Sequence, residues 1–284
     1  MVKDISISEV HDFWEKNPLF LGESEFKYGS AEFFANHTAT VLQDCFAGKL
    51  DCRTIPFCNI DEPILDAGCG IGFWTEIFVK KGFSKVFICD LTQTAITATL
   101  ERIKLQETKV TPAVMNVEAL KYPDNFFSHV NCQGVIHHTP NPQNAVDEIF
   151  RVLAPGGTAS ISVYYKSPLF KIFVLSPIIG ALLNKIGIGL RGRGREEIFK
   201  NRNIAEIVRM YDGKDNPIGN YYSRKEFKKI LNQYEIEQLY LHYFPIRQMR
   251  FNIPNKLHFL LDRYLGLMIY ATLRKPLQNK VSQA

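Results

Sequence analysis

A glycine-rich stretch that begins at an acidic residue is the part of the sequence best suited to chemistry. The run Ile64-Leu-Asp-Ala-Gly-Cys-Gly-Ile-Gly72 places Asp66 at the end of an apolar segment, with Gly68, Gly70 and Gly72 in the turn that follows. Glycines let the backbone approach a ligand closely and adopt positive φ angles. The same glycines also suit a tight strand-to-helix turn without a ligand, so by themselves they leave both interpretations open.

A second acidic residue, Asp90, ends the next apolar segment, 20 positions after Gly70. In an open α/β sheet the ligand crevice lies outside the carboxyl ends of the strands. A carboxylate at the end of the second strand can accept hydrogen bonds from both hydroxyls of a ribose. The loop and Asp90 together predict a site for a ligand that contains adenosine.

The spacing of the glycines separates two classes of such ligands. The dinucleotide fingerprint G-x-G-x-x-G/A needs a small third residue, and counting from Gly68 that position is Phe73. A nicotinamide oxidoreductase is therefore disfavoured. The chain instead reads D-x-G-x-G-x-G from Asp66, which suits a ligand without a pyrophosphate whose amino-acid end lies along the loop. S-adenosylmethionine is the candidate.

The elements that must position these residues alternate between strands and helices. Short apolar or alternating runs predict strands over 63–67, 85–90, 110–115, 127–135, 159–163, 234–243 and 267–273. Apolar residues at helical spacing predict helices over 72–81, 93–105 and 142–153. Strands that alternate with helices of 10–15 residues indicate βαβ units and a mostly parallel sheet.

This alternation is interrupted after Tyr165. Residues 166–220 are first apolar and then basic at Arg191-Gly-Arg-Gly-Arg195, and they end in an amphipathic helix. We expect an insertion over the carboxyl edge of the sheet, after which a capping box at Ser223-Arg-Lys-Glu226 restores the pattern. The predicted divisions are a helical cover (1–62), a ligand-binding core (63–165), the insertion (166–220) and a carboxy-terminal completion of the core (221–284) with further cover at about 245–265.

Four separated signatures resemble those of class I S-adenosylmethionine-dependent methyltransferases, in the broad branch that includes small-molecule and quinone C-methyltransferases. They are Ile64 to Thr75, Asp90, Asn116 to Asp124, and Gln133 to His138 together with Arg151 to Gly157. The resemblance covers residues 63–165. It implies an α/β, Rossmann-like sheet of seven strands, mostly parallel with the last strand reversed, and helical lid insertions.

The same resemblance implies a role for each matching residue. The methionine end of the cofactor would lie against Asp66, Gly68, Gly70 and Gly72, the ribose against Asp90 and Leu91, the adenine against Asn116 and Val117, and the sulfonium and methionine portion near Gln133. Asn116 and Ser128 depart from the family, which usually has Asp at both positions. An amide oxygen still accepts a hydrogen bond, but without charge. The expected cofactor is S-adenosylmethionine and its product is S-adenosylhomocysteine.

Two histidines follow the fourth predicted strand, at the edge where the methyl group should emerge. Methyl transfer from a sulfonium is an in-line displacement, so positioning and exclusion of water supply much of the rate. A base is needed only if the nucleophile must lose a proton. His137 and His138 have an ordinary pKa near 6.5 that suits this task, and we favour His137. Either one can instead cap the next helix or pack against the insertion.

Aromatic and basic residues outside the core are candidates to cover the cofactor or to bind the acceptor. We expect Trp14 and Tyr28 to cover the cofactor, and the acceptor pocket to be lined by Tyr164, Tyr165, Phe173, Arg193 and Arg247. The apolar half of the insertion suits a hydrophobic acceptor, and its arginines suit a carboxylate or phosphate. A packed cover with a solvated basic loop is the alternative for this insertion.

Composition limits the class of partner. The chain has 284 residues, of which 46% are apolar and 22% are charged, and its net charge of +5 is too small by itself to imply nucleic acid. The N/D-P-P-F/Y motif typical of amino-directed nucleic-acid methyltransferases does not follow the fourth predicted strand. We therefore expect a small-molecule methyl acceptor. An RNA or DNA methyltransferase and a non-catalytic S-adenosylmethionine-binding protein are the alternatives.

Further patterns bear on metal, membrane and compartment. The six cysteines form no C-x-x-C pair, so we expect no metal site. The longest uninterrupted apolar run, Ile172 to Leu183, has 12 residues, whereas a spanning helix needs about 20. The first residues have no signal-peptide pattern, and we expect a cytoplasmic protein with reduced thiols. A homodimer is left open.

Overall fold

The computed structural model describes residues 5–104, 106, 110–175, 193–195, 198, 201, 203–244 and 253–277, with the backbone alone at 172–175. Its centre is an eight-stranded sheet in the order β3-β2-β1-β4-β5-β8-β7, with β6 paired to β5 beside this path. The strands are β1 (Ile64–Ala67), β2 (Val86–Asp90), β3 (Val110–Val114), β4 (Phe127–Gln133), β5 (Leu153–Tyr165), β6 (Tyr221–Tyr222), β7 (Glu235–His242) and β8 (Met268–Arg274).

The direction of the strands confirms the predicted fold class. Strands β1 to β6 pair in parallel, while β8 runs antiparallel to both of its neighbours, β5 and β7. The reversed last strand and the seven predicted strands are therefore present. The two-residue strand β6 was not predicted, because a segment this short carries no periodicity.

The helices begin and end where local signals place them. They are α1 (Ile7–Lys16), α2 (Ala31–Phe46), α3 (Phe73–Lys80), α4 (Gln93–Ile103), α5 (Pro142–Val152), α6 (Pro168–Leu175), α8 (Ile204–Met210), α9 (Arg224–Ile230) and α10 (Asn255–Leu265), with short 3₁₀ turns η1 (Cys52–Thr54) and η2 (Ile136–His138). Ser223 and Glu226 form the predicted capping box of α9. Pro142 opens α5 as predicted, but the side chain of Asn141 makes no capping hydrogen bond.

Two apolar clusters sandwich the parallel part of the sheet. Neighbouring residues of a strand point to opposite faces, and accordingly Leu65 packs in a cluster with Ile149 of α5, while Ile64 packs in a second cluster with Phe78 of α3 and Ile96 of α4. Because both faces are covered by helices, β1 is buried along its whole length. The carboxyl ends of these strands are thereby held in one plane.

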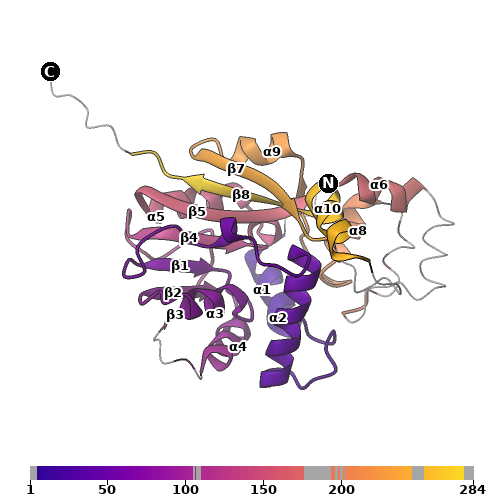
Figure 1. Cartoon of the computed structure of the whole chain (residues 1–284), viewed down its shortest axis with the longest axis horizontal. Coiled ribbons are helices and arrows are strands. Elements are labelled where there is room, and N and C mark those ends of the chain that lie inside the picture. Colours follow the sequence, from indigo (N-terminus) through magenta and orange to yellow (C-terminus); the bar gives the residue numbers. More distant parts are fainter. Residues whose placement is uncertain are drawn as a thin grey trace.

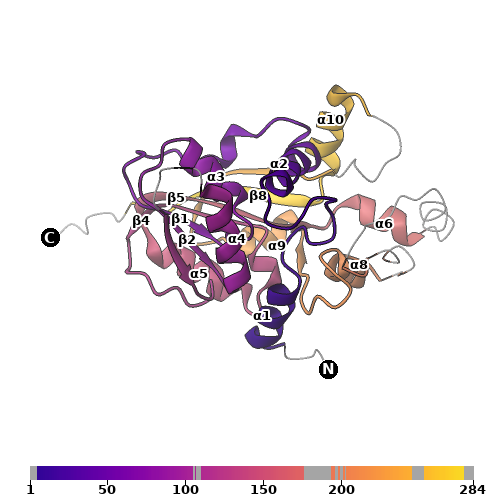
Figure 2. The same ribbon diagram turned by 90° about the horizontal axis from the view of Figure 1, so that it is seen from below.

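Helices α6, α8 and α10 lie together beyond the carboxyl end of β5. Both views place α6 and α8 at the same end of the molecule, to the right, with α10 above them in the second view (Figures 1 and 2). Helix α6 begins at Pro168, directly after β5 ends at Tyr165. The cover elements at 166–220 and 245–265 and the boundaries of the four predicted divisions remain predictions.

A buried histidine fastens the amino-terminal cover to the last strands. His242 of β7 pairs through Nδ1 with Asp262 of α10 at 2.5 Å and through Nε2 with Asp51, just before η1, at 3.0 Å. Burial by itself would lower the pKa of His242, but the hydrogen bonds with Asp262 and Asp51 raise it above its ordinary value. The imidazole therefore joins three segments that are far apart in the sequence.

Over the residues that the structure describes, no helix is long and apolar enough to cross a membrane. Within the same residues, no group of three or more His, Cys, Asp or Glu side chains is arranged to hold a metal ion. All six cysteines are free thiols.

Candidate active site

A cavity of about 320 Å³ opens at the carboxyl ends of β1, β2 and β4. Small-molecule sites of open α/β sheets lie at this edge, and this volume lies within their usual range. The cavity brings together twelve of the residues singled out from the sequence, namely Trp14, Gly68, Gly70, Asp90, Leu91, Asn116, Val117, Gln133, His137, His138, Tyr164 and Arg193.

The glycine loop after β1 lines the floor of the cavity. Gly68 has a φ of 75°, and a Cβ placed there would lie 2.3 Å from Cγ2 of Val135, so only glycine fits. A Cβ at Gly70 would meet only Leu19, at 3.7 Å. Gly72 has a different role: it lies at the start of α3 and not among the described residues that line the cavity. A Cβ placed there would lie 3.0 Å from Cγ2 of Thr99 in α4, so glycine lets the two helices pack closely.

Asp66 lies beneath the loop and does not line the cavity. Its side chain is buried and accepts hydrogen bonds from Thr75 Oγ1 at 2.6 Å and from Asn131 Nδ2 at 2.8 Å. Burial raises the pKa of Asp66 to about 6, against the opposing effect of these two hydrogen bonds. Asp66 thus ties β1 to α3 and β4. Its contact with the methionine end of the cofactor stays a prediction.

Asp90 at the end of β2 does line the cavity. Its Oδ2 accepts a hydrogen bond from the backbone N–H of Gly70 at 3.0 Å, and its Oδ1 accepts bonds from the backbone and hydroxyl of Thr92 at 3.0 and 2.9 Å. Burial raises the pKa of Asp90. These bonds fix the carboxylate beside the loop, and a carboxylate has about four lone-pair sites, so it can still accept a hydrogen bond from a ligand.

Residues after β2, β3 and β4 complete the same wall. Leu91, Asn116 and Val117 border the cavity next to Asp90. Gln133 at the end of β4 donates from Nε2 to Asn131 Oδ1 at 2.8 Å, while its Oε1 is buried without a hydrogen-bond partner among the described residues. Gln133 therefore has a spare acceptor in the cavity.

A polar cluster faces this wall from the ends of β4 and β5. His138 pairs through Nε2 with Asp212 Oδ2 at 3.3 Å, and its Nδ1 donates to the carbonyl oxygen of Ile218 at 2.7 Å. The hydroxyl of Tyr164 donates to the same Asp212 oxygen at 2.6 Å. Both ring nitrogens of His138 are therefore engaged by oxygen acceptors.

His137 has a different environment from its neighbour. Its ring packs at 4.4 Å from the ring of Tyr164 and at 4.1 Å from that of His138, and its Nδ1 is buried without a hydrogen-bond partner among the described residues. Burial, together with the nearby His138, holds the pKa of His137 well below its ordinary value. His137 is therefore neutral near pH 7 and keeps a ring nitrogen that can accept a hydrogen bond.

His138 and Arg193 keep the carboxyl group of Asp212 ionised. Burial by itself would raise the pKa of this carboxyl, but the hydrogen bond with His138 and the charges of His138 and Arg193 hold it well below its usual range. Burial and the adjacent Asp212 raise the pKa of Tyr164 well above its ordinary value. Tyr164 thus remains a protonated hydrogen-bond donor.

The two aromatic residues predicted to cover the cofactor differ in position. Trp14 of α1 lines the cavity, and its ring lies 5.2 Å from that of His138 in an edge-on contact. Tyr28 is not among the described cavity residues and packs at 4.8 Å against Phe33 of α2. Burial and the charge of Asp90 raise the pKa of Tyr28 to about 12, so Tyr28 lies close to the site without lining it.

The five predicted acceptor residues are also divided. Tyr164 and Arg193 line the cavity. Tyr165 does not: it packs against the main apolar cluster, with the Arg224 guanidinium 6.0 Å from its ring centre. Adjacent residues of a strand face opposite sides, so β5 can present only one of the two tyrosines. The side chain of Phe173 and all of Arg247 lie outside the described residues.

Some residues of the site were missed in the sequence. Asp212, Glu23 and Tyr211 all line the cavity. The Asp212-Gly213 pair has the pattern of an ordinary turn, and Glu23 lies in a polar loop, so neither carried a signal. Thr75 and Asn131 were missed as well, because they act through neighbours: both donate to the buried Asp66, and Asn131 also accepts from Gln133.

Comparison with known proteins gives a consistent result for the core. Residues 65–161 match the family model described as a methyltransferase domain. The chain is 31% identical over 152 residues to the ubiquinone biosynthesis O-methyltransferase of Psychrobacter arcticus, covering 52% of this chain and 56% of the relative. It is 30% identical over 132 residues to the ubiquinone/menaquinone biosynthesis C-methyltransferase of Hydrogenovibrio crunogenus, covering 42% and 52%. The chain thus spans about half the length of these curated relatives.

One solved structure resembles nearly the whole chain. It is a chain from the complex between the Haloferax volcanii Trm112 methyltransferase activator and a methyltransferase, with a TM-score of 0.58 over 96% of this chain and 99% of that chain. The two sequences are 14% identical, so this likeness shows the fold alone.

Proposed function

The chain carries a class I S-adenosylmethionine-dependent methyltransferase domain with a Rossmann-like fold, and from this premise we propose that the protein transfers a methyl group to a small-molecule acceptor bound in the cavity. The observation that carries the proposal is the composition of this single cavity. One wall holds the glycine loop and Asp90, and the facing wall holds the polar cluster around His137.

The residues of the first wall fit the donor. Gly70 has room above its Cα, a Cβ at Gly134 would meet nothing within 4 Å, and the Oε1 of Gln133 lacks a partner among the described residues. We assign the ribose to Asp90 and Leu91 and the methionine end to the loop and Gln133. Asn116 and Val117 frame the adenine. S-adenosylmethionine, when bound, supplies a methyl group that its sulfonium already activates.

The second wall positions the acceptor and excludes water. Trp14, Tyr164 and Tyr211 surround the polar cluster with aromatic surface, which suits an acceptor with a ring or another apolar part. Displacement at a methyl group needs little from the protein beyond alignment and a dry site. This aromatic wall is therefore consistent with the acceptors that the names of the curated relatives suggest, which are precursors of quinones.

His137 is the side chain we assign to the acceptor's proton. His138 has both nitrogens engaged, whereas His137 is neutral and retains an unpartnered Nδ1. An acceptor hydroxyl or acidic C–H placed at Nδ1 can donate its proton there as the new bond to carbon forms. His138 and Asp212 then act as positioning residues, because they hold Tyr164 and the adjacent ring in place.

A direct test uses the purified protein with methyl-labelled S-adenosylmethionine and a cell extract, followed by mass spectrometry. We expect a labelled small molecule that is absent when the protein is omitted, and calorimetry should show binding of S-adenosylhomocysteine. A protein that binds S-adenosylhomocysteine but labels no product would be a binding protein without transfer activity. A protein that labels only RNA or DNA would support the nucleic-acid alternative instead.

A further inference from the structure

Arg193 is a buried arginine whose hydrogen-bond donors are only partly used. Its side chain is 4% exposed, and Nη2 donates to Glu23 Oε1 at 2.5 Å. The Nε and Nη1 groups are buried without any hydrogen-bond partner among the described residues. A guanidinium keeps its charge and offers five N–H donors in a planar fork. Native structures seldom leave buried donors unpaired, so unpaired ones indicate a missing partner.

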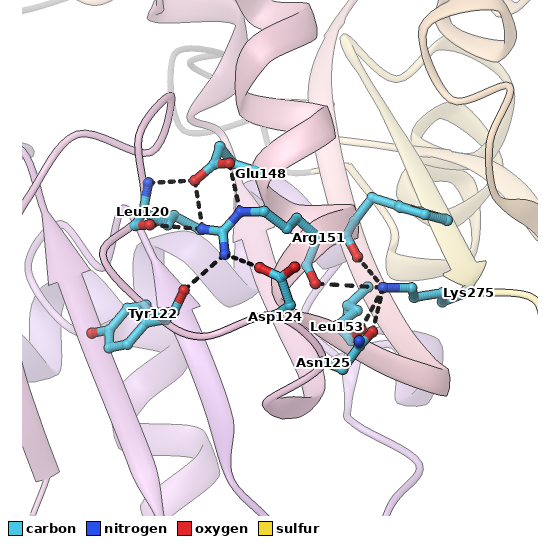
Figure 3. Close-up of polar contacts among 9 residues, drawn as sticks. Leu120, Tyr122, Asp124, Asn125, Glu148, Arg151, Leu153 and Lys275 are labelled. Carbon is cyan, nitrogen blue, oxygen red and sulfur yellow. Dashed lines mark hydrogen bonds and ion pairs between the residues drawn. The ribbon is translucent and has the colours of Figure 1, made fainter.

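Elsewhere the chain gives a comparable arginine a full set of partners. Arg151 of α5 donates from Nε and both Nη atoms to the carboxylates of Glu148 and Asp124 and to the backbone oxygens of Leu120 and Tyr122 (Figure 3). Its five N–H groups are thereby all used. Arg151 shows that this chain can supply acceptors for all five N–H groups of an arginine. The missing acceptors at Arg193 are therefore a local property of the cavity.

The carboxylates near Arg193 are already engaged. Glu23 Oε1 also pairs with Nη2 of Arg195 at 2.9 Å, so one carboxylate serves two guanidinium groups. The Oδ2 atom of Asp212 accepts from Tyr164 and pairs with His138. Neither carboxylate forms a hydrogen bond with the Nε or Nη1 of Arg193, so each of these two donors can still bind an oxygen of a ligand.

The backbone holds Arg193 in an unusual conformation. Its φ is 55°, which a residue with a side chain rarely adopts, and its carbonyl oxygen accepts a hydrogen bond from Lys214 at 2.9 Å. At Gly213 an added Cβ would lie 2.9 Å from Phe13 and 3.5 Å from Cβ of Arg193. The absence of a side chain at Gly213 therefore lets α1 and Arg193 pack closely, and the guanidinium is held before any ligand arrives.

Arg193 lies on the acceptor side of the cavity. A Cβ placed at Gly213, the residue after Asp212, would lie 3.5 Å from Cβ of Arg193, so Arg193 lies beside the cluster in which Tyr164 donates to Asp212. The donor, in contrast, has its own set of partners at the loop, Asp90 and Gln133. An anionic group of the acceptor is thus better placed to reach Arg193 than any part of the donor.

We propose that Arg193 binds a carboxylate or phosphate group of the methyl acceptor through its Nη1, so that the enzyme selects an anionic small molecule. The inference rests on the proposed function and adds the charge of the substrate to it. The outer edge of a guanidinium, formed by its two Nη atoms, can pair with two oxygens of one carboxylate or phosphate, which an ammonium cannot do. Arginine and lysine at this position should therefore differ.

The test begins with the labelled product of the extract assay. We expect an anion exchanger at pH 7 to retain this product, and we expect Arg193→Gln to raise the KM for the purified acceptor by about 10- to 150-fold, the range for one or two charge-assisted hydrogen bonds. Arg193→Lys should recover only part of this loss. Arg263→Gln, which makes the same chemical change on the exposed side of α10, should behave as the unaltered protein.

Binding of two adenosine compounds separates the remaining outcomes. Arg193→Gln should keep the affinity for S-adenosylhomocysteine, which also shows that the variant is folded, because Glu23 still pairs with Arg195. A variant that loses affinity for S-adenosylhomocysteine, but not for 5′-methylthioadenosine, would assign Arg193 to the donor's carboxylate and overturn the proposal. A neutral product or an unchanged KM would also overturn it. If no product is labelled, the proposed function fails first and this inference fails with it.

Discussion

Two groups of basic side chains, one around Arg151 and Lys275 and the other in the cavity, differ in how completely their donors are satisfied. Near the start of β5, Arg151 and Lys275 donate to oxygen acceptors with every nitrogen they have (Figure 3). In the cavity at the opposite end of the same strand, Arg193 leaves two nitrogens without a partner among the described residues. The first group stabilises the fold. In the second group, donors of Arg193 lack acceptors, which a ligand can supply.

Lys275 shows what a completed network does. Its Nζ donates to the carbonyl oxygens of Phe150 and Leu153, both at 2.7 Å, and to Asn125 Oδ1 at 2.8 Å. A cation at the carboxyl end of a helix also interacts favourably with the helix dipole. Burial lowers the pKa of Lys275, but its acceptors compensate for the loss of water. Lys275 therefore joins the chain after β8 to the end of α5.

The cavity shows the opposite pattern on three of its lining residues. Arg193, His137 and Gln133 together have four buried polar atoms without a hydrogen-bond partner among the described residues. The set contains both donors and acceptors, as a ligand with a charged end and a protonated nucleophile requires. Other buried polar atoms of the described residues also lack a partner, Tyr122 and Ser160 among them, but Arg193, His137 and Gln133 line one cavity, where a ligand can reach them.

The largest expected effect is on kcat, when the residue assigned to the proton of the methyl acceptor is removed. His137→Ala should lower kcat for the labelled acceptor by about 100-fold or more, the usual contribution of a positioned proton acceptor. The affinity for S-adenosylhomocysteine, measured by calorimetry, should remain unchanged. His11→Ala, a change to a half-exposed histidine of α1, is the control. Equal kcat values at saturating acceptor would remove His137 from the chemistry.

Lys275→Met should cause the largest loss of stability. The change leaves two backbone carbonyl oxygens and Asn125 without their donor, which should cost about 2–5 kcal/mol in the free energy of unfolding. Urea denaturation followed by circular dichroism measures this loss, with Lys85→Met on the surface as the control. A loss below about 1 kcal/mol would show that the completed network contributes little, and the contrast with the cavity would lose its basis.

Asp90→Ala tests the donor wall. Removing the carboxylate takes away the expected bonds to ribose and the contact with Gly70, so the affinity for S-adenosylhomocysteine should fall by about 10- to 150-fold. Calorimetry gives this value directly, and Asp215→Ala on the exposed surface should leave it unchanged. An unaltered dissociation constant in the Asp90 variant would contradict the ribose assignment.

Asp212 should make the cavity cluster sensitive to acid. Because its folded pKa lies below its unfolded value near 3.9, Asp212 contributes stability that is fully present above that value and is lost as the pH falls further. Denaturation between pH 6 and pH 2 should show a smaller loss for Asp212→Asn than for the unaltered protein, by about 2 kcal/mol. Asp215→Asn should follow the unaltered protein. Parallel curves for all three proteins would contradict the pairing with His138.

The smallest effect is expected where the donors are incomplete. Arg193→Leu removes a charge whose Nε and Nη1 have no partner among the described residues, and Glu23 keeps Arg195 as its partner, so the free energy of unfolding should change by less than about 1 kcal/mol. The measurement is the same denaturation used for Lys275→Met. A loss as large as that of Lys275→Met would mean that Arg193 serves the fold, which would erase the difference between the two groups.

Local patterns in the sequence were enough to predict the sheet and the donor wall. Short apolar runs, separated by segments of helical periodicity, predicted the strands and their order along the chain. This was possible because each strand or helix is determined by residues that are neighbours in the chain. The glycine loop and Asp90 were found for the same reason, because they lie at the ends of predicted strands and the carboxyl ends of parallel strands meet at one edge. Asn116 and Gln133 were predicted from the resemblance to methyltransferases.

Contacts between distant segments could not be predicted in this way. Arg193 meets Glu23 across 170 positions of the chain, and Asp212 meets Tyr164 across 48. The type of each residue does not indicate which distant residue it will contact. Which of Tyr164 and Tyr165 faces the cavity was open for a related reason, because the alternation of a strand does not state which face is covered.

The sequence by itself therefore determined the class of fold and the place that we propose for an adenosine ligand. Only the tertiary structure decided that Asp66 and Gly72 do not line the cavity, that His137 rather than His138 keeps a nitrogen without a partner among the described residues, and that the side chain of Arg193 is buried with unpaired donors. The reason is that burial and hydrogen-bond satisfaction belong to a residue's surroundings in space, and those surroundings come from segments that the chain brings together only when it folds.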